Sequence, residues 1–169
     1  VDIAGASPAE AGMMLSAFAF VAFPCSLLVP VLVVRYDAVL VVVGVAVAGG
    51  ATGLAGLLLI PGVATWLWVV CFGLAGALFP MTLALLGVRS RTHEGAVALS
   101  GFVQSVGYAI VALFPVGVGL LHELTTTWTV PLLVLIVLVL TALPAGIIAA
   151  RRRTVEDEWE QRHGAWNGA

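Results

Sequence analysis

The stretch from Ser100 to Pro115 sets an ordered group of polar side chains into an apolar background. Gly101, Gln104, Ser105 and Tyr108 follow one another at i, i+3, i+4 and i+7, so a helix would place them on one face. An amide buried in hydrocarbon without a partner costs on the order of a few kcal/mol, and Gln104 should therefore face protein or a water-filled cavity. The spacing predicts a substrate path lined by Gln104, Ser105 and Tyr108. The alternative is that these side chains only form hydrogen bonds between helices.

A second candidate group surrounds Pro80. Phe79 and Thr82 flank this proline, where a kink would expose backbone carbonyls and help to line a cavity. We therefore add Phe79 and Thr82 to the predicted substrate-binding residues.

The composition identifies the class of protein that carries these residues. Hydrophobic residues make up 62% of the 169 positions, charged residues 9%, and the mean hydropathy is +1.15. Such values are typical of integral membrane proteins, and the apolar runs lack the alternation of a transmembrane barrel. The net charge is -2, all basic side chains other than histidine are arginines, and no basic surface points to nucleic acid.

Charged islands divide the chain into five predicted helices. At about 20 residues per crossing, the expected spans are residues 9–34, 38–60, 62–88, 95–121 and 128–150. Residues 38–88 hold two of them, because Pro61 and Gly62 give a turn signal near the middle. Ser7, Pro8 and Glu10 predict the start of the first helix as N-cap, first and third helical residues. Residues 151–169 form a charged tail, and the bundle occupies residues 1–150.

The arginines predict the orientation of these spans. With five crossings every arginine falls on one side of the membrane, which is the cytoplasmic side by the positive-inside rule. The tryptophans Trp66, Trp68 and Trp128 gather at the opposite interface, as an aromatic belt does. We therefore expect a multi-pass protein of the cell membrane with its carboxyl end in the cytoplasm.

Small residues predict how the helices pack in lipid. Gly49 and Gly53 form a small-xxx-small pair in the second span. Stripes of small residues also run along the third and fourth spans, and they predict close contact between those two helices. These stripes comprise Gly73, Gly76, Ala77, Pro80, Ala84 and Gly87, and Gly101, Ser105, Ala112 and Pro115.

Several loosely spaced motifs resemble the cyanate transporter branch of the major facilitator superfamily. They are Ser7-Pro8 with Ala11-Gly12, Leu28-Val29-Pro30, Arg89 to Thr92 with Ala96, Leu99-Ser100-Gly101, Gln104 to Tyr108, Pro115, Trp128 and Pro131. The resemblance covers nearly the whole chain and assigns it to the carboxyl-terminal half of the fold. The five spans would then be helices eight to twelve of twelve.

The resemblance implies a function and a partner. It implies secondary active transport of a small solute, with a small anion such as cyanate as the expected substrate, by alternating access between two halves. The partner would be an amino-terminal half of the same protein. Arg35 and Asp37 would match the superfamily's cytoplasmic gating motif, although on the residues alone they are better explained as a pair that stops transfer. No cofactor or metal is expected.

Two other classes of function compete with transport. An intramembrane enzyme is not expected, because Ala98 replaces the glycine of a serine-protease motif and His93 and His122 would lie about 40 Å apart along a helix. A non-transporting membrane subunit or assembly scaffold would use the small-residue stripes equally well. The chain begins with Val1 and carries no signal-peptide pattern, so we expect a fragment or a processed product. Cys25 and Cys71 sit in apolar runs and are expected to pack as small hydrophobes.

Overall fold

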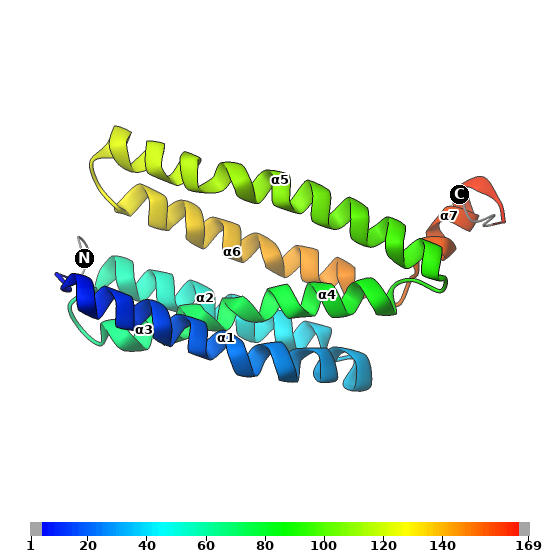
Figure 1. The fold of residues 1–169 in the computed structure, drawn as a ribbon, viewed down its shortest axis with the longest axis horizontal. Helices are drawn as coiled ribbons and strands as arrows, with labels where there is room; N and C mark the ends of the chain where they lie inside the picture. Colours follow the sequence, from blue (N-terminus) through cyan, green and yellow to red (C-terminus); the bar gives the residue numbers. More distant parts are fainter. Residues whose placement is uncertain (1–4, 166–169) are drawn as a thin grey trace.

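The computed structural model describes residues 5–165. In that part of the chain all regular secondary structure is helical (Figure 1). Five of its helices are long and apolar enough to cross a membrane, which confirms the all-α membrane fold. They are α1 (Pro8–Tyr36), α2 (Val39–Leu59), the segment Thr65–Val88, α5 (His93–Thr125) and α6 (Thr129–Ala149).

Local sequence signals account for the ends of α1. Ser7 and Glu10 form the predicted capping box, in which the Ser7 N–H donates to the Glu10 carboxylate over 2.8 Å, and Pro8 is the first helical residue. At the other end Asp37 adopts a left-handed conformation with φ of 50°. Asp tolerates this conformation better than most residues, so α1 and α2 can join through a very short turn.

The third span is divided into α3 (Thr65–Gly73), a 3-10 turn η1 (Leu74–Ala77) and α4 (Leu78–Val88). Pro80 explains the division, because its ring clashes with the carbonyl four residues earlier, that of Gly76 in η1. The distortion expected around Pro80 is therefore present, and it takes the form of a tightened turn.

The helix α2 is the centre of the packed core. Its side chains Val39, Val43, Ala46 and Val47 are almost fully buried, and it packs against α3 on one side and α6 on the other. A Cβ at Gly53 would lie 2.5 Å from the Phe72 amide nitrogen, so only glycine allows this close approach. The predicted small-xxx-small packing of α2 is confirmed.

The expected contact between the stripes on the third and fourth spans is not seen. Gly73 faces Val21 of α1, where an added Cβ would meet the valine Cβ at 3.0 Å. Gly87 and Gly101 have no described neighbour within 4 Å of such a Cβ. The prediction failed because a stripe of small residues does not specify which helix will cover it.

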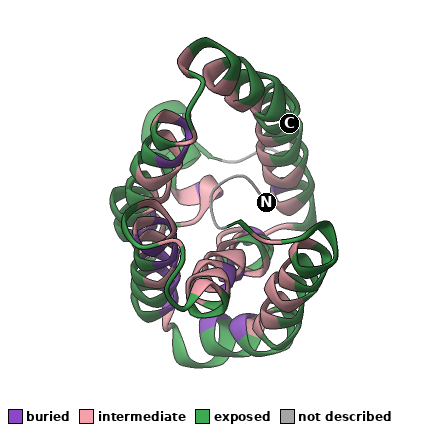
Figure 2. Ribbon diagram, turned by 90° about the vertical axis from the view of Figure 1, so that its left-hand side faces the viewer, coloured by how far each residue is buried: buried purple, intermediate pink, exposed green. Residues whose placement is uncertain are grey.

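The helices α5 and α6 form a separate layer above α1–α4 in Figure 1. Gly95 is the one buried residue that α5 contributes among the described residues. In Figure 2 the buried positions lie where helices face one another, and the outer sides are exposed. The helix α5 is therefore positioned mainly through its ends and through α6.

The two ends of the bundle differ in composition. The α1–α2 turn, the α4–α5 turn and the residues after α6 meet at one end, and each contains an arginine or follows a helix whose last turn carries one (Figure 1). The α2–α3 and α5–α6 connections, which adjoin the tryptophans, lie at the other end. We call these the arginine end and the tryptophan end.

The predicted charged tail contains a further short helix. The helix α7 (Val155–His163) begins at a capping box formed by Thr154 and Asp157 and lies at the arginine end (Figure 1). Residues 166–169 of the predicted tail lie outside the described residues.

Candidate functional site

The predicted polar face on α5 is present as a groove. Because α5 is continuous through this region, the i, i+3, i+4, i+7 spacing brings Gly101, Gln104, Ser105 and Tyr108 together along one side. They line a groove of about 660 Å³ that extends toward His93. Every residue lining this groove belongs to α5. The groove therefore has one wall, and no other described helix lines it.

The groove residues are exposed. The side chain of Tyr108 is 57% exposed, Gln104 and Ser105 are also exposed, and the Gln104 amide has no hydrogen-bond partner among residues 5–165. A primary amide has donors and an acceptor, and hydrocarbon can satisfy neither. In a membrane this face therefore needs water, a solute or another protein surface against it.

Around Gln104, Ser105 and Tyr108 the groove offers neutral hydrogen-bonding groups beside an aromatic ring, and His93 lies at its end. Gln104, Ser105 and Tyr108 each can donate and accept, and no carboxylate or arginine lines the groove. Such a surface suits a small polar or planar solute. Within residues 5–165 no cluster of histidine, cysteine and acidic side chains could hold a metal ion.

The structure does not bring Phe79 and Thr82 to the α5 groove. Thr82 donates its hydroxyl to the Leu78 carbonyl over 2.9 Å and lines a different cleft. The side chain of Phe79 is 60% exposed on α4. Thr82 thus satisfies the Leu78 carbonyl near Pro80, where the sequence predicts carbonyls exposed to a cavity.

Asp37 has partners, whereas Arg35 points elsewhere. The Asp37 carboxylate accepts from Arg152 over 2.7 Å and lies 3.9 Å from an Arg89 nitrogen. The guanidinium of Arg35 instead lies over the Tyr36 ring, 5.8 Å from its centroid. Asp37 therefore connects the α1–α2 turn to the ends of α4 and α6. The sequence predicts that Asp37, Arg89 and Arg152 lie on one side of the membrane, but it does not predict that they form these pairs.

Glu156 is a further residue of the arginine end that sequence patterns do not single out. Its carboxylate accepts hydrogen bonds from the backbone N–H groups of Arg91 and Thr92, each over 3.0 Å, and from the Thr92 hydroxyl over 2.9 Å. Gly95 leaves room for it, since an added Cβ there would collide with Glu156 Oε1. Burial opposes ionisation, but the hydrogen bonds outweigh it and lower the pKa of Glu156 to about 2. A fully buried anion thus lies at the amino end of α5, where the helix dipole favours it.

Ion pairs extend this contact. Arg91 lies 3.4 Å from Asp157 and 3.0 Å from Glu160, both on α7. The Val155 N–H donates to the Arg89 carbonyl over 3.0 Å. The tail helix is therefore attached to the α4–α5 turn by backbone and side-chain contacts, which hold the arginine end of α5.

Comparison with known proteins identifies similar transporters. The chain is 35% identical over 164 residues to an uncharacterized transporter, YycB, of Bacillus subtilis (strain 168), which covers 95% of the chain and 40% of that protein. It is 40% identical over 110 residues, 64% of the chain and 65% of the relative, to a protein of Thauera aromatica provisionally named an anionic 4-hydroxy-benzoate permease. It is 36% identical over 106 residues, 62% of the chain and 27% of the relative, to the 2-nitroimidazole transporter of Escherichia coli (strain K12).

The chain thus spans less than two thirds of the length of each of these relatives. No family model matches it, and no solved structure matches it. The chain is therefore a multi-pass membrane protein similar to proteins named as transporters.

Proposed function

We propose that this chain supplies five membrane helices of a secondary transporter, and that the α5 groove lines the path of a small solute. The observation that carries the proposal is the one-walled groove of Gln104, Ser105 and Tyr108. A membrane-crossing helix with an exposed amide needs a polar space or a facing protein surface. A solute path between two protein walls provides both. The names of the three relatives support the same class of function.

The facing wall would be an amino-terminal half of the same protein, as in the major facilitator superfamily. The chain spans 40% of the first of these relatives, which leaves length for a further set of helices in a protein of that size. Alternating access would then move the two halves about the solute at mid-membrane depth. In this arrangement the arginine end is cytoplasmic and the membrane is the cell membrane.

The proposed solute is a small organic or inorganic anion. Cyanate follows from the resemblance to cyanate transporters, whereas two relatives are named for the small planar molecules 4-hydroxy-benzoate and 2-nitroimidazole. Gln104 and Ser105 can donate hydrogen bonds to a carboxylate or cyanate, and the Tyr108 ring can stack on a planar solute. Arg35 and Asp37 are retained as the proposed cytoplasmic gate, in which Asp37 acts through Arg89 and Arg152.

Uptake by the complete protein tests this function. Cells producing Gln104→Ala or Tyr108→Ala should accumulate labelled cyanate or 4-hydroxybenzoate at least about tenfold more slowly than wild type, because each variant removes a solute contact. Val106→Ala, on the opposite side of α5, is the matched control and should transport normally. Equal amounts of protein in the membrane must be verified by immunoblot. Unchanged uptake in both groove variants would show that these side chains serve helix packing and not solute binding.

A further inference from the structure

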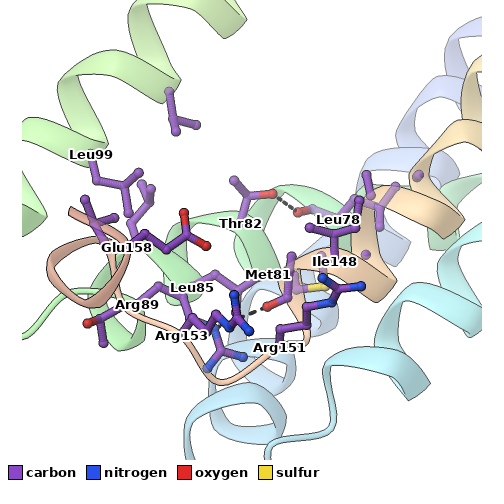
Figure 3. Close-up of a pocket in the computed structure, with 18 residues that line it drawn as sticks. Leu78, Met81, Thr82, Leu85, Arg89, Leu99, Ile148, Arg151, Arg153 and Glu158 are labelled. Atoms are coloured by element: carbon purple, nitrogen blue, oxygen red, sulfur yellow. Dashed lines mark hydrogen bonds between the residues drawn. The ribbon is translucent and has the colours of Figure 1, made fainter. Parts of the chain in front are cut away.

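A second cavity lies at the arginine end and is separate from the α5 groove. It has a volume of about 470 Å³ and is lined by α4, α5, α6, the segment that leads into α7 and the first turn of α7 (Figure 3). We call it the arginine cleft. It is the part of the described structure in which an apolar cavity and several arginines meet.

The inner part of the arginine cleft is apolar. Its walls are formed by aliphatic side chains of three helices, including Leu78, Met81, Leu85, Leu99, Val103 and Ala142. From Leu78 to Arg89 the wall extends 11 residues along α4, which is about 16 Å at 1.5 Å per residue. This length and polarity suit a hydrocarbon chain that runs parallel to the helices.

The mouth of the cleft carries an excess of positive charge. Arg89, Arg151 and Arg153 gather on one side of the cleft in Figure 3, and Glu158 is the acidic residue among the lining residues. Arg89 is held by the Ala149 and Ala150 carbonyls at 3.2 and 3.3 Å. Arg151 and Arg153 are exposed and form no ion pair with a carboxylate of residues 5–165. Two guanidinium groups are thus available to an anion.

The arginine cleft and the groove use different sides of α5. Leu99 and Val103 line the cleft, whereas Gln104 and Tyr108 line the groove. At 100° per residue, Tyr108 is rotated by about 140° from Val103 around the helix axis. The two cavities share no lining residue. An occupant of the cleft would therefore not be the solute in the groove.

We propose that the arginine cleft binds an anionic phospholipid of the leaflet at the arginine end. The phosphate would lie between Arg151 and Arg153, and one acyl chain would enter the apolar cavity. Arginine binds phosphate oxygens through paired N–H donors, and basic pockets between membrane helices recognise anionic headgroups. A soluble anion would use the arginines but leave the apolar walls without a partner, so the observations favour an amphiphile. The proposal requires membrane-crossing helices and does not depend on the transported solute.

Native mass spectrometry of the complete purified protein tests the proposal, with dioleoylphosphatidylglycerol as the probe and dioleoylphosphatidylcholine as the neutral lipid. We expect phosphatidylglycerol to bind preferentially, and Arg151→Gln/Arg153→Gln to weaken its binding about tenfold or more. Arg162→Gln removes the same charge from the outer turn of α7, away from the cleft, and should bind as wild type. Glu158→Gln should strengthen binding, since it removes the opposing charge from the mouth.

A second variant tests the apolar part of the site. Ala145→Phe should fill the cavity and weaken phosphatidylglycerol binding while both arginines remain. If Ala145→Phe does not fold, the arginine variants still decide the question, because they alter exposed side chains. Equal binding of both lipids, or unchanged binding by Arg151→Gln/Arg153→Gln, would overturn the proposal.

Competition separates the lipid from a soluble anion. Displacement of phosphatidylglycerol by millimolar inorganic phosphate or benzoate would assign the cleft to soluble anions and overturn the lipid proposal. Uptake measured in parallel keeps the two proposals distinct. A variant of the arginine cleft that loses lipid binding but keeps normal uptake tests the lipid proposal alone. If the groove variants do not slow uptake, the proposed transport path is contradicted and the lipid proposal is unaffected.

Discussion

The carboxylate of Glu156 binds the amino end of α5 through Thr92, whose backbone N–H and hydroxyl both donate to Glu156 Oε1, over 3.0 and 2.9 Å. These two residues lie 64 positions apart in the sequence. Thr92 is also the N-cap of α5, and its hydroxyl oxygen accepts from the Gly95 N–H over 3.0 Å. The tail therefore completes the cap of the helix that carries the candidate solute groove.

Glu156→Gln is expected to detach α7 from the α4–α5 turn. A glutamine amide places an NH2 group where the carboxylate accepts from a backbone N–H, so one hydrogen bond becomes a donor-donor conflict worth about 1–3 kcal/mol. Amide hydrogen exchange over Val155–His163 should become faster. Glu123→Gln, at the tryptophan end, is the control and should leave this exchange unchanged. Equal protection in Glu156→Gln would show that the Arg91 ion pairs and the Val155–Arg89 backbone hydrogen bond hold the tail without the Glu156 carboxylate.

Tail attachment should depend on pH below the ordinary range of carboxylates. The pKa of Glu156 is lowered from 4.5 to about 2 in the folded chain. A lowered folded-state pKa stabilises docking above the unfolded value, and this stabilisation is lost as the pH falls from 4.5 toward 2. Spin labels are placed at Glu94 and Arg162 in a protein with Cys25 and Cys71 replaced by serine. The distribution of distances between the two labels should be broader at pH 2.5 than at pH 6.

The same labels on Glu156→Gln provide the control for pH. This variant lacks the titrating group and should give a broad distance distribution at both pH values. If it shows the same transition as wild type, the pH dependence belongs to another carboxylate such as Asp157.

The packing of α2 on α3 gives a prediction about stability. Gly53→Ala forces a Cβ to within 2.5 Å of the Trp68 carbonyl oxygen, and backbone atoms cannot move aside as a side chain can. Overpacking of this kind costs about 1–3 kcal/mol, which should lower the melting temperature by roughly 5 °C. Gly44→Ala has no neighbour within 4 Å and should not lower it. Thermal unfolding in detergent followed by size-exclusion chromatography measures both, and equal melting temperatures would contradict the close packing.

The orientation of the bundle predicts from which side of the membrane an impermeant reagent can reach each end. A cysteine at Glu123, near the tryptophan end, should react with an impermeant maleimide added to intact cells. A cysteine at Arg162, in the tail helix, should react only after the cells are opened. The reverse pattern would place the arginine end outside and contradict the positive-inside assignment.

Sequence periodicity and composition predicted the part of the fold that depends on burial in lipid. The five helices, the capping box at Ser7 and the turn at Pro61-Gly62 follow from hydropathy and local hydrogen bonding, which a short stretch of sequence determines. The α5 face was predicted for the same reason, because helical spacing alone brings Gln104 and Tyr108 to one side.

Contacts between distant segments could not be predicted in this way. A glutamate in a charged tail is expected to be solvated, and the sequence around Glu156 does not indicate that Thr92 will bind it. The arginine cleft depends on the separation of α4, α5 and α6, which small-residue stripes did not specify. Thr82 and Gln104 lie on different helices, so spacing along one helix could not predict that Thr82 lines the arginine cleft and not the α5 groove.

Cysteine accessibility along α5 tests the central claim, that the Gln104 and Tyr108 face lines a polar path. In the complete protein, with Cys25 and Cys71 replaced by serine, single cysteines at Gln104, Tyr108, Val106 and Ile110 are treated with a hydrophilic methanethiosulfonate. We predict rapid reaction at Gln104 and Tyr108, slowed by the transported anion, and little reaction at Val106 and Ile110. Equal reactivity at all four positions, or reaction only at Val106 and Ile110, would contradict the proposed path.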